Sequence, residues 1–241
     1  MKRSIIIGIA LGSLTVSSAM AADPGFAAKG PYGEPVYSWT GCYAGIHAGG
    51  GLHTSSFVDD VAVAGVGAIA GGQVGCNYQY NQIVVGLEGE AFWSGLNTQR
   101  AETDPTVFSD TAQSDNRYDG TIALRLGYAF DRLLAYGKVG AAFGNFAWSE
   151  ADSSFTAPTA FYNATAAQTI AGFLFGFGFE YALADRWSAK IEYNYIDYGD
   201  PVITFAQTCV GAGCGTFPSS FSSTEKEIKQ IVKVGLNYRF Y

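Results

Sequence analysis

Residues 228–241 are IKQIVKVGLNYRFY, a stretch in which apolar side chains alternate with polar or small ones. One face would carry Val232, Val234, Leu236, Tyr238 and Phe240, and the other Lys233, Gly235, Asn237 and Arg239. Successive side chains of a β-strand point to opposite faces, so this alternation predicts a strand. Its apolar face would pack on a core in a soluble sandwich and would contact lipid in an outer-membrane barrel. One strand alone does not distinguish the two.

Seven further segments alternate in the same way, the first and the fifth of the eight more weakly than the rest. In the fifth we place Lys138 inward and Val139 outward. The eight predicted strands lie at 39–51, 70–80, 83–94, 118–130, 133–148, 168–183, 187–198 and 228–241. The segment 168–183 places five aromatic side chains on one face, namely Phe173, Phe175, Phe177, Phe179 and Tyr181. A core on that face would need an equally large apolar partner, and no amphipathic helical pattern supplies one. We therefore predict an all-β fold, an eight-stranded antiparallel up-and-down transmembrane β-barrel.

The links between these segments are alternately short and long. Short links at 81–82, 131–132 and 184–186 alternate with long ones at 52–69, 95–117, 149–167 and 199–226. Short periplasmic turns and longer extracellular loops are typical of outer-membrane barrels. Aromatic residues near predicted strand ends would form girdles at the membrane interfaces; these are Trp39, Tyr80, Trp93, Tyr128, Trp148 and Trp187.

The composition agrees with a membrane barrel. Hydrophobic residues make up 48% of the chain and charged residues 15%, against the roughly 25% charged residues of soluble domains. No run of eighteen apolar residues follows the first twenty, which argues against a helical membrane protein. The net charge is −7, and without a basic cluster nucleic-acid binding is not expected.

The N-terminus predicts export. Lys2 and Arg3 precede an apolar region, and Ala19-Met20-Ala21 fits a small-x-small cleavage motif. We predict a signal peptide at 1–21, an extended Pro- and Gly-rich periplasmic lead-in at 22–38, and the barrel at 39–241.

The polar faces of the predicted strands indicate a network inside the barrel. Its expected members are His47, Glu88, Glu90, Arg125, Lys138, Glu180, Lys190, Glu192, Lys233 and Arg239. Eight strands leave an interior that side chains about fill, and an isolated charge there is costly, so acids and bases should pair. Two interpretations remain: these pairs close the lumen, or they line a narrow path for water or ions.

Catalytic residues are not predicted. The sequence lacks His-Glu-x-x-His, Gly-x-Ser-x-Gly and the phosphate-binding Gly-Lys-Ser/Thr motif, and we expect no metal and no cofactor. We interpret His47, which shares its face with Tyr43, as a hydrogen-bonding lumen residue. His53 lies where the first long link begins; such a histidine is usually solvated, although it could ligate a haem or a metal.

Four cysteines in an exported chain are disulfide candidates. Cys209 and Cys214 enclose four residues, and we expect a bond there that rigidifies the last extracellular loop. Cys42 and Cys76 fall on the apolar faces of neighbouring strands. For that pair a cross-strand disulfide and two free, lipid-facing thiols both remain open.

Several motifs carry a resemblance to a known family: WTGCYAG at 39–45, GGQVG at 71–75, LRLGYA at 124–129 and VKVGLNYRF at 232–240. From Trp39 onward the chain resembles the small OmpA-like barrels of alphaproteobacteria, known as major outer-membrane immunogenic, porin-family or opacity-like proteins. The resemblance implies a surface-exposed barrel that stabilises the envelope or faces a host. It also implies possible haemin binding and an assumed porin activity.

The resemblance further implies an assembly signal made by Tyr238, Phe240 and Tyr241. Chains of this family usually finish on the phenylalanine, whereas here Tyr241 follows it, out of phase with the lipid face. Expected partners are outer-membrane lipid and lipopolysaccharide, the barrel-assembly machinery, and host or surface ligands. The expected function is a structural surface barrel. The alternatives are a small-pore porin for water, ions or small solutes, and a barrel that binds haemin or another apolar ligand.

Overall fold

The computed structural model describes residues 37–56, 62–102, 110–153, 161–211, 214 and 219–240. The predicted signal peptide and most of the predicted lead-in therefore lie outside the described residues, as does Tyr241.

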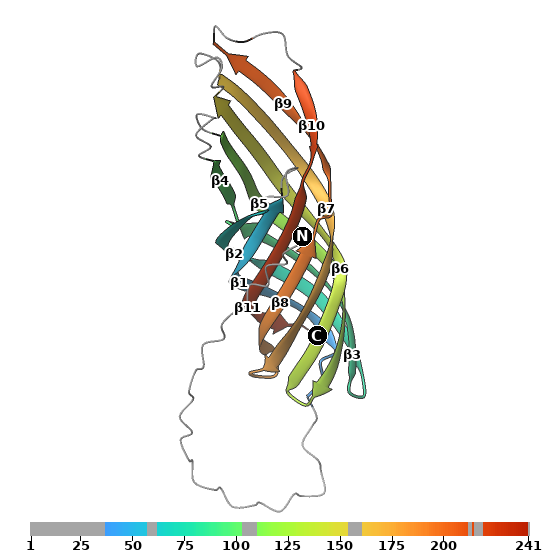
Figure 1. Ribbon diagram of the computed structural model, residues 1–241. Coiled ribbons are helices and arrows are strands. Elements are labelled where there is room, and N and C mark those ends of the chain that lie inside the picture. The colour runs from blue at the N-terminus through green and yellow to red at the C-terminus, as the bar shows by residue number, and fades with distance from the viewer. Residues whose placement is uncertain are drawn as a thin grey trace, which may run out of the picture. The chain divides into compact units, whose positions relative to one another are not determined.

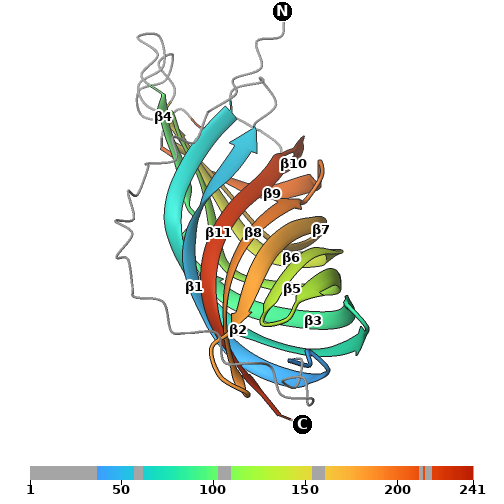
Figure 2. The same cartoon turned by 90° about the horizontal axis from the view of Figure 1, so that it is seen from below.

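Eight strands form a closed antiparallel barrel (Figure 1). They are β1 (Gly41–Ser56), β2 (Ala62–Tyr80), β3 (Ile83–Ser94), β5 (Asp110–Phe130), β6 (Leu133–Ser153), β7 (Phe161–Ala182), β8 (Trp187–Asp197) and β11 (Lys226–Arg239). Each pairs with the next, and β11 pairs with β1 from Tyr43↔Arg239 to Ser56↔Lys226. In Figure 2 β11 lies beside β1, where the ring closes. The predicted fold class is confirmed.

The strands extend further from the short turns than the sequence pattern predicts. β3 has the predicted bounds, but β1 continues to Ser56, β2 begins at Ala62 and β6 continues to Ser153. The predicted long links also contain β4 (Thr98–Glu102), β9 (Val202–Val210) and β10 (Ser220–Thr224). Much of what the Ser-, Thr- and Asp-rich composition predicts as loop is thus paired strand, because outside lipid the exposed face of a strand carries such residues.

These outer parts form a sheet that rises beyond the barrel, hereafter the extracellular sheet. β4 pairs with the upper part of β5, β9 pairs with the upper part of β7, and β10 pairs with β9. Figure 1 shows β9 and β10 well beyond the ends of β1 and β2. The barrel wall and the extracellular sheet therefore share β5, β6 and β7.

The barrel wall has an apolar outer face and a polar inner face. Along β3, exposed and buried residues alternate without interruption. The five aromatic side chains predicted on one face of β7 all point outward, each about half exposed, with Phe177 at 50%. Val139 is likewise outside and Lys138 inside, as predicted. Apolar side chains that remain about half exposed on the outside of the barrel are what a lipid environment stabilises.

The turns at the periplasmic end are tight. Asn81 and Asp131 each adopt a positive φ, 53° and 54°, in the two-residue links between β2 and β3 and between β5 and β6. Asn and Asp tolerate this left-handed conformation better than other side chains, which suits them to short hairpins. The sequence-predicted turn positions are confirmed.

Residues 37–40 lie against the periplasmic mouth. The indole of Trp39 is buried with Val84, Leu134 and Tyr136, and its Nε1 donates to the carbonyl of Asp131 at 3.1 Å. The predicted interfacial position of Trp39 is therefore wrong. Trp148 is also buried, because it lies on the same face of β6 as the inward-pointing Lys138. Tyr80, Trp93, Tyr128 and Trp187 are exposed, as a girdle requires.

In the part of the chain that the structure describes, no helix is long and apolar enough to cross a membrane.

A charge introduced at a lipid-facing position should destabilise the protein more than a charge introduced at a water-facing position on the same strand. Phe177→Arg should destabilise the protein by about 2–4 kcal/mol, because a charge is then held against hydrocarbon. Phe161→Arg, on the outer part of β7 and equally exposed at 54%, should change stability by no more than about 0.5 kcal/mol. Urea unfolding in lipid vesicles measures both. Equal losses for the two variants would contradict the placement of the membrane.

Candidate functional site

Eight charged side chains meet inside the barrel, hereafter the lumen cluster. They are Glu88 and Glu90 of β3, Arg125 of β5, Lys138 of β6, Glu180 of β7, Lys190 and Glu192 of β8, and Lys233 of β11. All are buried, none more than 6% exposed. Four acids face four bases, so the cluster is formally neutral. Each member was predicted from its place on a polar strand face, and the structure brings all eight together.

Short ion pairs connect neighbouring and opposite strands. Lys233 Nζ lies 2.6 Å from Glu90 Oε2 and 3.0 Å from Glu192 Oε1. Lys138 Nζ lies 2.7 Å from the same Glu192 oxygen and 3.2 Å from Glu90. Taking charges out of water costs several kcal/mol per ion, and only close pairing of this kind offsets it.

Arg125 lies at the periplasmic side of the lumen cluster. Its guanidinium donates to Glu180 Oε2 at 2.8 Å and lies 3.9 Å from the ring centre of Tyr136. Tyr136 donates to Glu192 and Tyr43 donates to Glu88, both at 2.7 Å. The sequence analysis did not place Tyr136 in the network, although its strand parity with Lys138 is a signal that could have found it.

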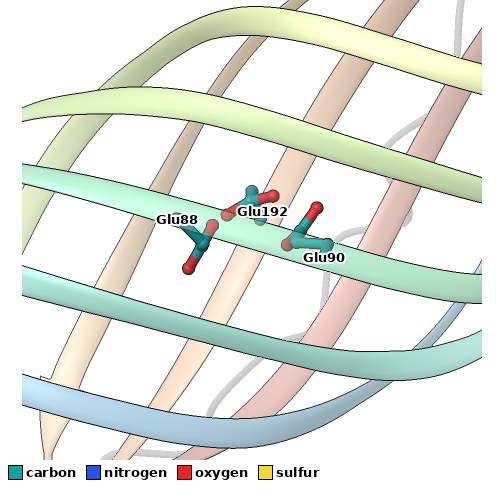
Figure 3. A group of neighbouring side chains, drawn as sticks. All are labelled: Glu88, Glu90 and Glu192. Carbon is teal, nitrogen blue, oxygen red and sulfur yellow. The ribbon is translucent and has the colours of Figure 1, made fainter.

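Three carboxylates of the lumen cluster converge. Figure 3 shows Glu88, Glu90 and Glu192 close together in the interior, and ligand oxygens from the three lie within 4.8 Å of one another. Oxygen donors at this spacing suit a divalent cation. However, Lys138 and Lys190 each contact all three. The ammonium groups already supply the positive charge, so the chemistry of this set favours an ion-pair cluster over a metal site.

A hydrophobic layer lies on the extracellular side of the lumen cluster. Its buried members are Ile69, Phe92, Leu96, Ala123, Ala142, Phe146, Trp148, Ala164, Ile170, Leu174, Ile196, Tyr198, Ile203, Phe205 and Ile231. Side chains from the barrel and from the extracellular sheet both contribute. Phe205, for example, is fully buried and stacks on Phe221 with ring centres 4.9 Å apart.

Two further polar groups are embedded in this layer. Lys229 donates to both oxygens of Asp119, at 2.8 and 2.9 Å. Glu227 accepts from Trp148 Nε1 at 3.0 Å and from Ser55 at 3.0 Å. None of these pairings was predicted. Ser55 was placed in a link and Trp148 at the membrane interface, whereas Asp119 and Lys229 lie in predicted strands, where parity with Arg125 and Lys233 could have identified them.

His53 differs from the sequence expectation. It is a fully buried residue of β1 rather than a solvated loop residue. Its Nε2 lies 2.5 Å from Glu227 Oε2 and its Nδ1 lies 3.0 Å from the carbonyl oxygen of Leu96. Both ring nitrogens are therefore engaged, which leaves none for a haem iron or a metal. The expectation was wrong because β1 ends five residues later than the alternation suggested, at Ser56 instead of Gly51.

The other predicted lumen residues have different outcomes. His47 is buried, and its Nδ1 lies 2.6 Å from Gln73 Oε1. Arg239 does not join the lumen cluster. At the periplasmic rim its guanidinium donates to the carbonyls of Ser38 and Asp185 and lies over the ring of Tyr37. It lies where β11 ends, too far along the strand to reach the lumen carboxylates.

Of the remaining predicted positions, Cys42, Cys76 and Phe240 are exposed, Cys209, Cys214 and Tyr238 are half-buried, and Tyr241 lies outside the described residues. Cys42 and Cys76 form a disulfide between directly paired residues of β1 and β2, and Cys209 and Cys214 form a second one. At the end of β11, Phe240 is 51% exposed.

Comparison with known proteins agrees with a barrel of this class. A family model described as outer membrane protein beta-barrel domain matches residues 9–240. The 31 kDa outer-membrane immunogenic protein of Brucella melitensis is 32% identical, with all of both chains covered. The 22 kDa outer membrane protein of Rhizobium leguminosarum bv. viciae is 30% identical over 68% of this chain and 67% of its own. OprG from Pseudomonas aeruginosa is a solved structure that is 13% identical, with 86% of this chain and all of OprG covered, at a TM-score of 0.47.

The closed barrel and its apolar outer face thus define a transmembrane β-barrel. The chain belongs to the outer membrane protein beta-barrel family, and it is a protein of the bacterial outer membrane, as its relatives are.

Neutralising one partner of an ion pair in the lumen cluster should lower the stability of the barrel more than neutralising both partners. Glu90→Gln leaves Lys233 short of a partner and should destabilise the barrel by about 3–5 kcal/mol. Glu90→Gln combined with Lys233→Met restores neutrality and should recover much of that loss. Urea unfolding in vesicles measures both. A double variant less stable than the single one would contradict the charge-balance explanation.

The extracellular sheet should respond to pH through Glu225, which lies between β10 and β11. Burial raises the pKa of Glu225 to about 7, and the nearby carboxylates of Glu150 and Glu227 add to the rise. The folded protein then binds a proton that the unfolded chain has released, so stability is highest below about pH 4.5 and falls as the pH rises through 7. Amide-exchange protection of β9 and β10 should be several-fold higher at pH 5 than at pH 8.

Glu225→Gln keeps the acceptor for the Ser223 hydroxyl, which donates at 2.7 Å, and should remove this pH dependence. Asp200→Asn, at an exposed position, should leave it in place. An unchanged pH dependence in Glu225→Gln would assign the effect to another group.

Proposed function

We propose that this chain is a closed, structural barrel that contributes to envelope integrity and presents its extracellular sheet to a host or to the environment. The observation that carries the proposal is the filling of the interior. From the periplasmic side, Trp39 and its neighbours, the lumen cluster and the hydrophobic layer follow one another across the bore.

A conducting path would have to cross all of these layers. The hydrophobic layer offers an ion no replacement for its hydration shell, and dry apolar constrictions block conduction. The charged side chains below it are held by several contacts each, as with Lys190, which contacts three carboxylates. The filled interior therefore supports the structural interpretation over the small-pore porin.

The charge distribution supports a role for the outer surface. The links that the sequence analysis predicted as long, at 52–69, 95–117, 149–167 and 199–226, hold ten acidic and three basic residues, and the rest of the chain holds eleven of each. These links therefore carry most of the net negative charge of the sequence. Such a surface favours cations and basic partners and disfavours close approach of anionic ones.

The edge of the extracellular sheet adds a second feature. β10 pairs with β9 on one side, and no strand of the described residues pairs with its other side. An unpaired edge presents backbone donors and acceptors to a partner.

At the opposite end of the molecule, the exposed aromatic Phe240 suits recognition by the barrel-assembly machinery.

Planar-bilayer recording tests the proposal directly. Purified full-length protein, with insertion verified by its heat-modifiable migration on gels, should give a silent bilayer. Glu88→Ala combined with Phe92→Ala and Phe146→Ala, which removes bulk from two layers, serves as the control for detection of a pore. Stable unit conductance of the wild type would replace the structural proposal with the porin alternative.

A deletion strain tests the structural role itself. Loss of the chain should increase sensitivity to detergent and to chelators of divalent cations, and the wild-type protein should restore resistance. Resistance equal to that of the parent strain after deletion would count against a contribution to envelope integrity.

A further inference from the structure

The disulfide between Cys42 and Cys76 lies on the lipid-facing surface. Both side chains are exposed on the outside of the barrel wall. Their neighbours on the same face of β2 are Val74 and Tyr78, which are 62% and 65% exposed. Cys76 lies four residues above the periplasmic turn, at the same distance from it as Leu87 on the adjacent strand. The bond therefore lies on the lipid-facing surface near its periplasmic end, where the carbonyl of Cys42, the second residue of β1, accepts from Phe240 N at 2.8 Å.

Thiol–disulfide exchange is poorly suited to that location. The attacking species is the thiolate, and a thiolate held against hydrocarbon is strongly disfavoured. A water-soluble oxidant in the periplasm also has no approach to sulfur atoms that lipid covers. Once the barrel is inserted, two reduced thiols at these positions are isolated from the chemistry that would join them.

The disulfide can fix the register of β1 and β2, which their sequences specify weakly. β1 and β2 pair over sixteen residues, from Gly41↔Asn77 to Ser56↔Ala62, and each contains five glycines. Gly-rich strands specify register weakly. A slip of two residues would keep every side chain on its proper face, so the alternation of polar and apolar residues does not prevent it. A covalent link between direct partners does.

We propose that the Cys42–Cys76 disulfide forms in the periplasm before insertion and fixes the register of the β1–β2 hairpin for barrel assembly. The two thiols give up two protons and two electrons as the sulfur–sulfur bond forms. A periplasmic dithiol–disulfide oxidant, in its disulfide form, accepts both and leaves as the dithiol. The full chain is thus a substrate for thiol oxidation while it is still in water.

The second disulfide provides an internal control. Cys209 belongs to β9, in the extracellular sheet, outside the lipid band. Its bond to Cys214 should therefore form and break at similar rates before and after insertion. Any difference between the two pairs then reports the lipid environment rather than a general property of the protein.

The timing is tested with two double variants of the full chain, each retaining one cysteine pair. Cys209→Ser/Cys214→Ser keeps the hairpin pair, and Cys42→Ser/Cys76→Ser keeps the extracellular pair. Each is reduced, either left unfolded in urea or inserted into phosphatidylcholine vesicles, and given oxidised glutathione. The reaction is quenched with acid. Alkylation with a high-mass maleimide then counts the thiols that remain.

The hairpin pair should oxidise in urea and at least 100-fold more slowly after insertion, whereas the extracellular pair should oxidise in both states. Failure of the reduced hairpin variant to insert also supports the proposal, because the bond is then required beforehand. Similar oxidation rates of the hairpin pair before and after insertion would overturn the proposed order of events.

The register is tested by cross-strand amide contacts in detergent micelles, measured by nuclear magnetic resonance. The wild type and the Cys209→Ser/Cys214→Ser variant should each give one set of β1–β2 contacts, including Ala44 with Val74. The Cys42→Ser/Cys76→Ser variant should give a second set displaced by two residues. A single native set in that variant would overturn the role in register.

Discussion

Charge balance among side chains buried inside the barrel is the constraint on which the rest of this structure depends. Four carboxylates and four basic groups are buried together, and each is stable only while its partners on other strands are in place. Those partners come from β3, β5, β6, β7, β8 and β11. The ion pairs therefore couple strands that are distant in sequence, and they can form together only when these six strands are in register.

Much of this arrangement could be predicted because a barrel in lipid follows a simple rule of alternation. Lys138 and Val139 were placed correctly by parity alone, and so were the other members of the lumen cluster. Which base contacts which acid could not be predicted, since the partners of Lys233 lie on β3 and β8, and neighbouring positions on a polar face look alike in sequence. Arg239 has the correct parity, but its height along the strand places it at the rim.

The outer half of the molecule was harder to predict for a physical reason. Beyond the membrane one face of a strand contacts water instead of lipid, so Thr, Ser and Ala replace the large apolar residues that mark a strand within the bilayer. β9 shows this: Ile203 and Phe205 are buried, whereas Thr204 and Ala206 face outward. The same change of pattern conceals His53 and Trp148. Their parity with His47 and Lys138 identifies them as inward residues once the strands are known to continue.

The continuity of β5, β6 and β7 has a mechanical consequence. These strands contain 21, 21 and 22 residues, so each runs about 70 Å from the periplasmic turns to the outer tip of the molecule. A pull applied at the tip is directed along the strands and loads many backbone hydrogen bonds at once in shear, instead of opening them one after another. The protruding sheet is therefore stiff along its strands and continuous with the part of the barrel wall that lies in the bilayer.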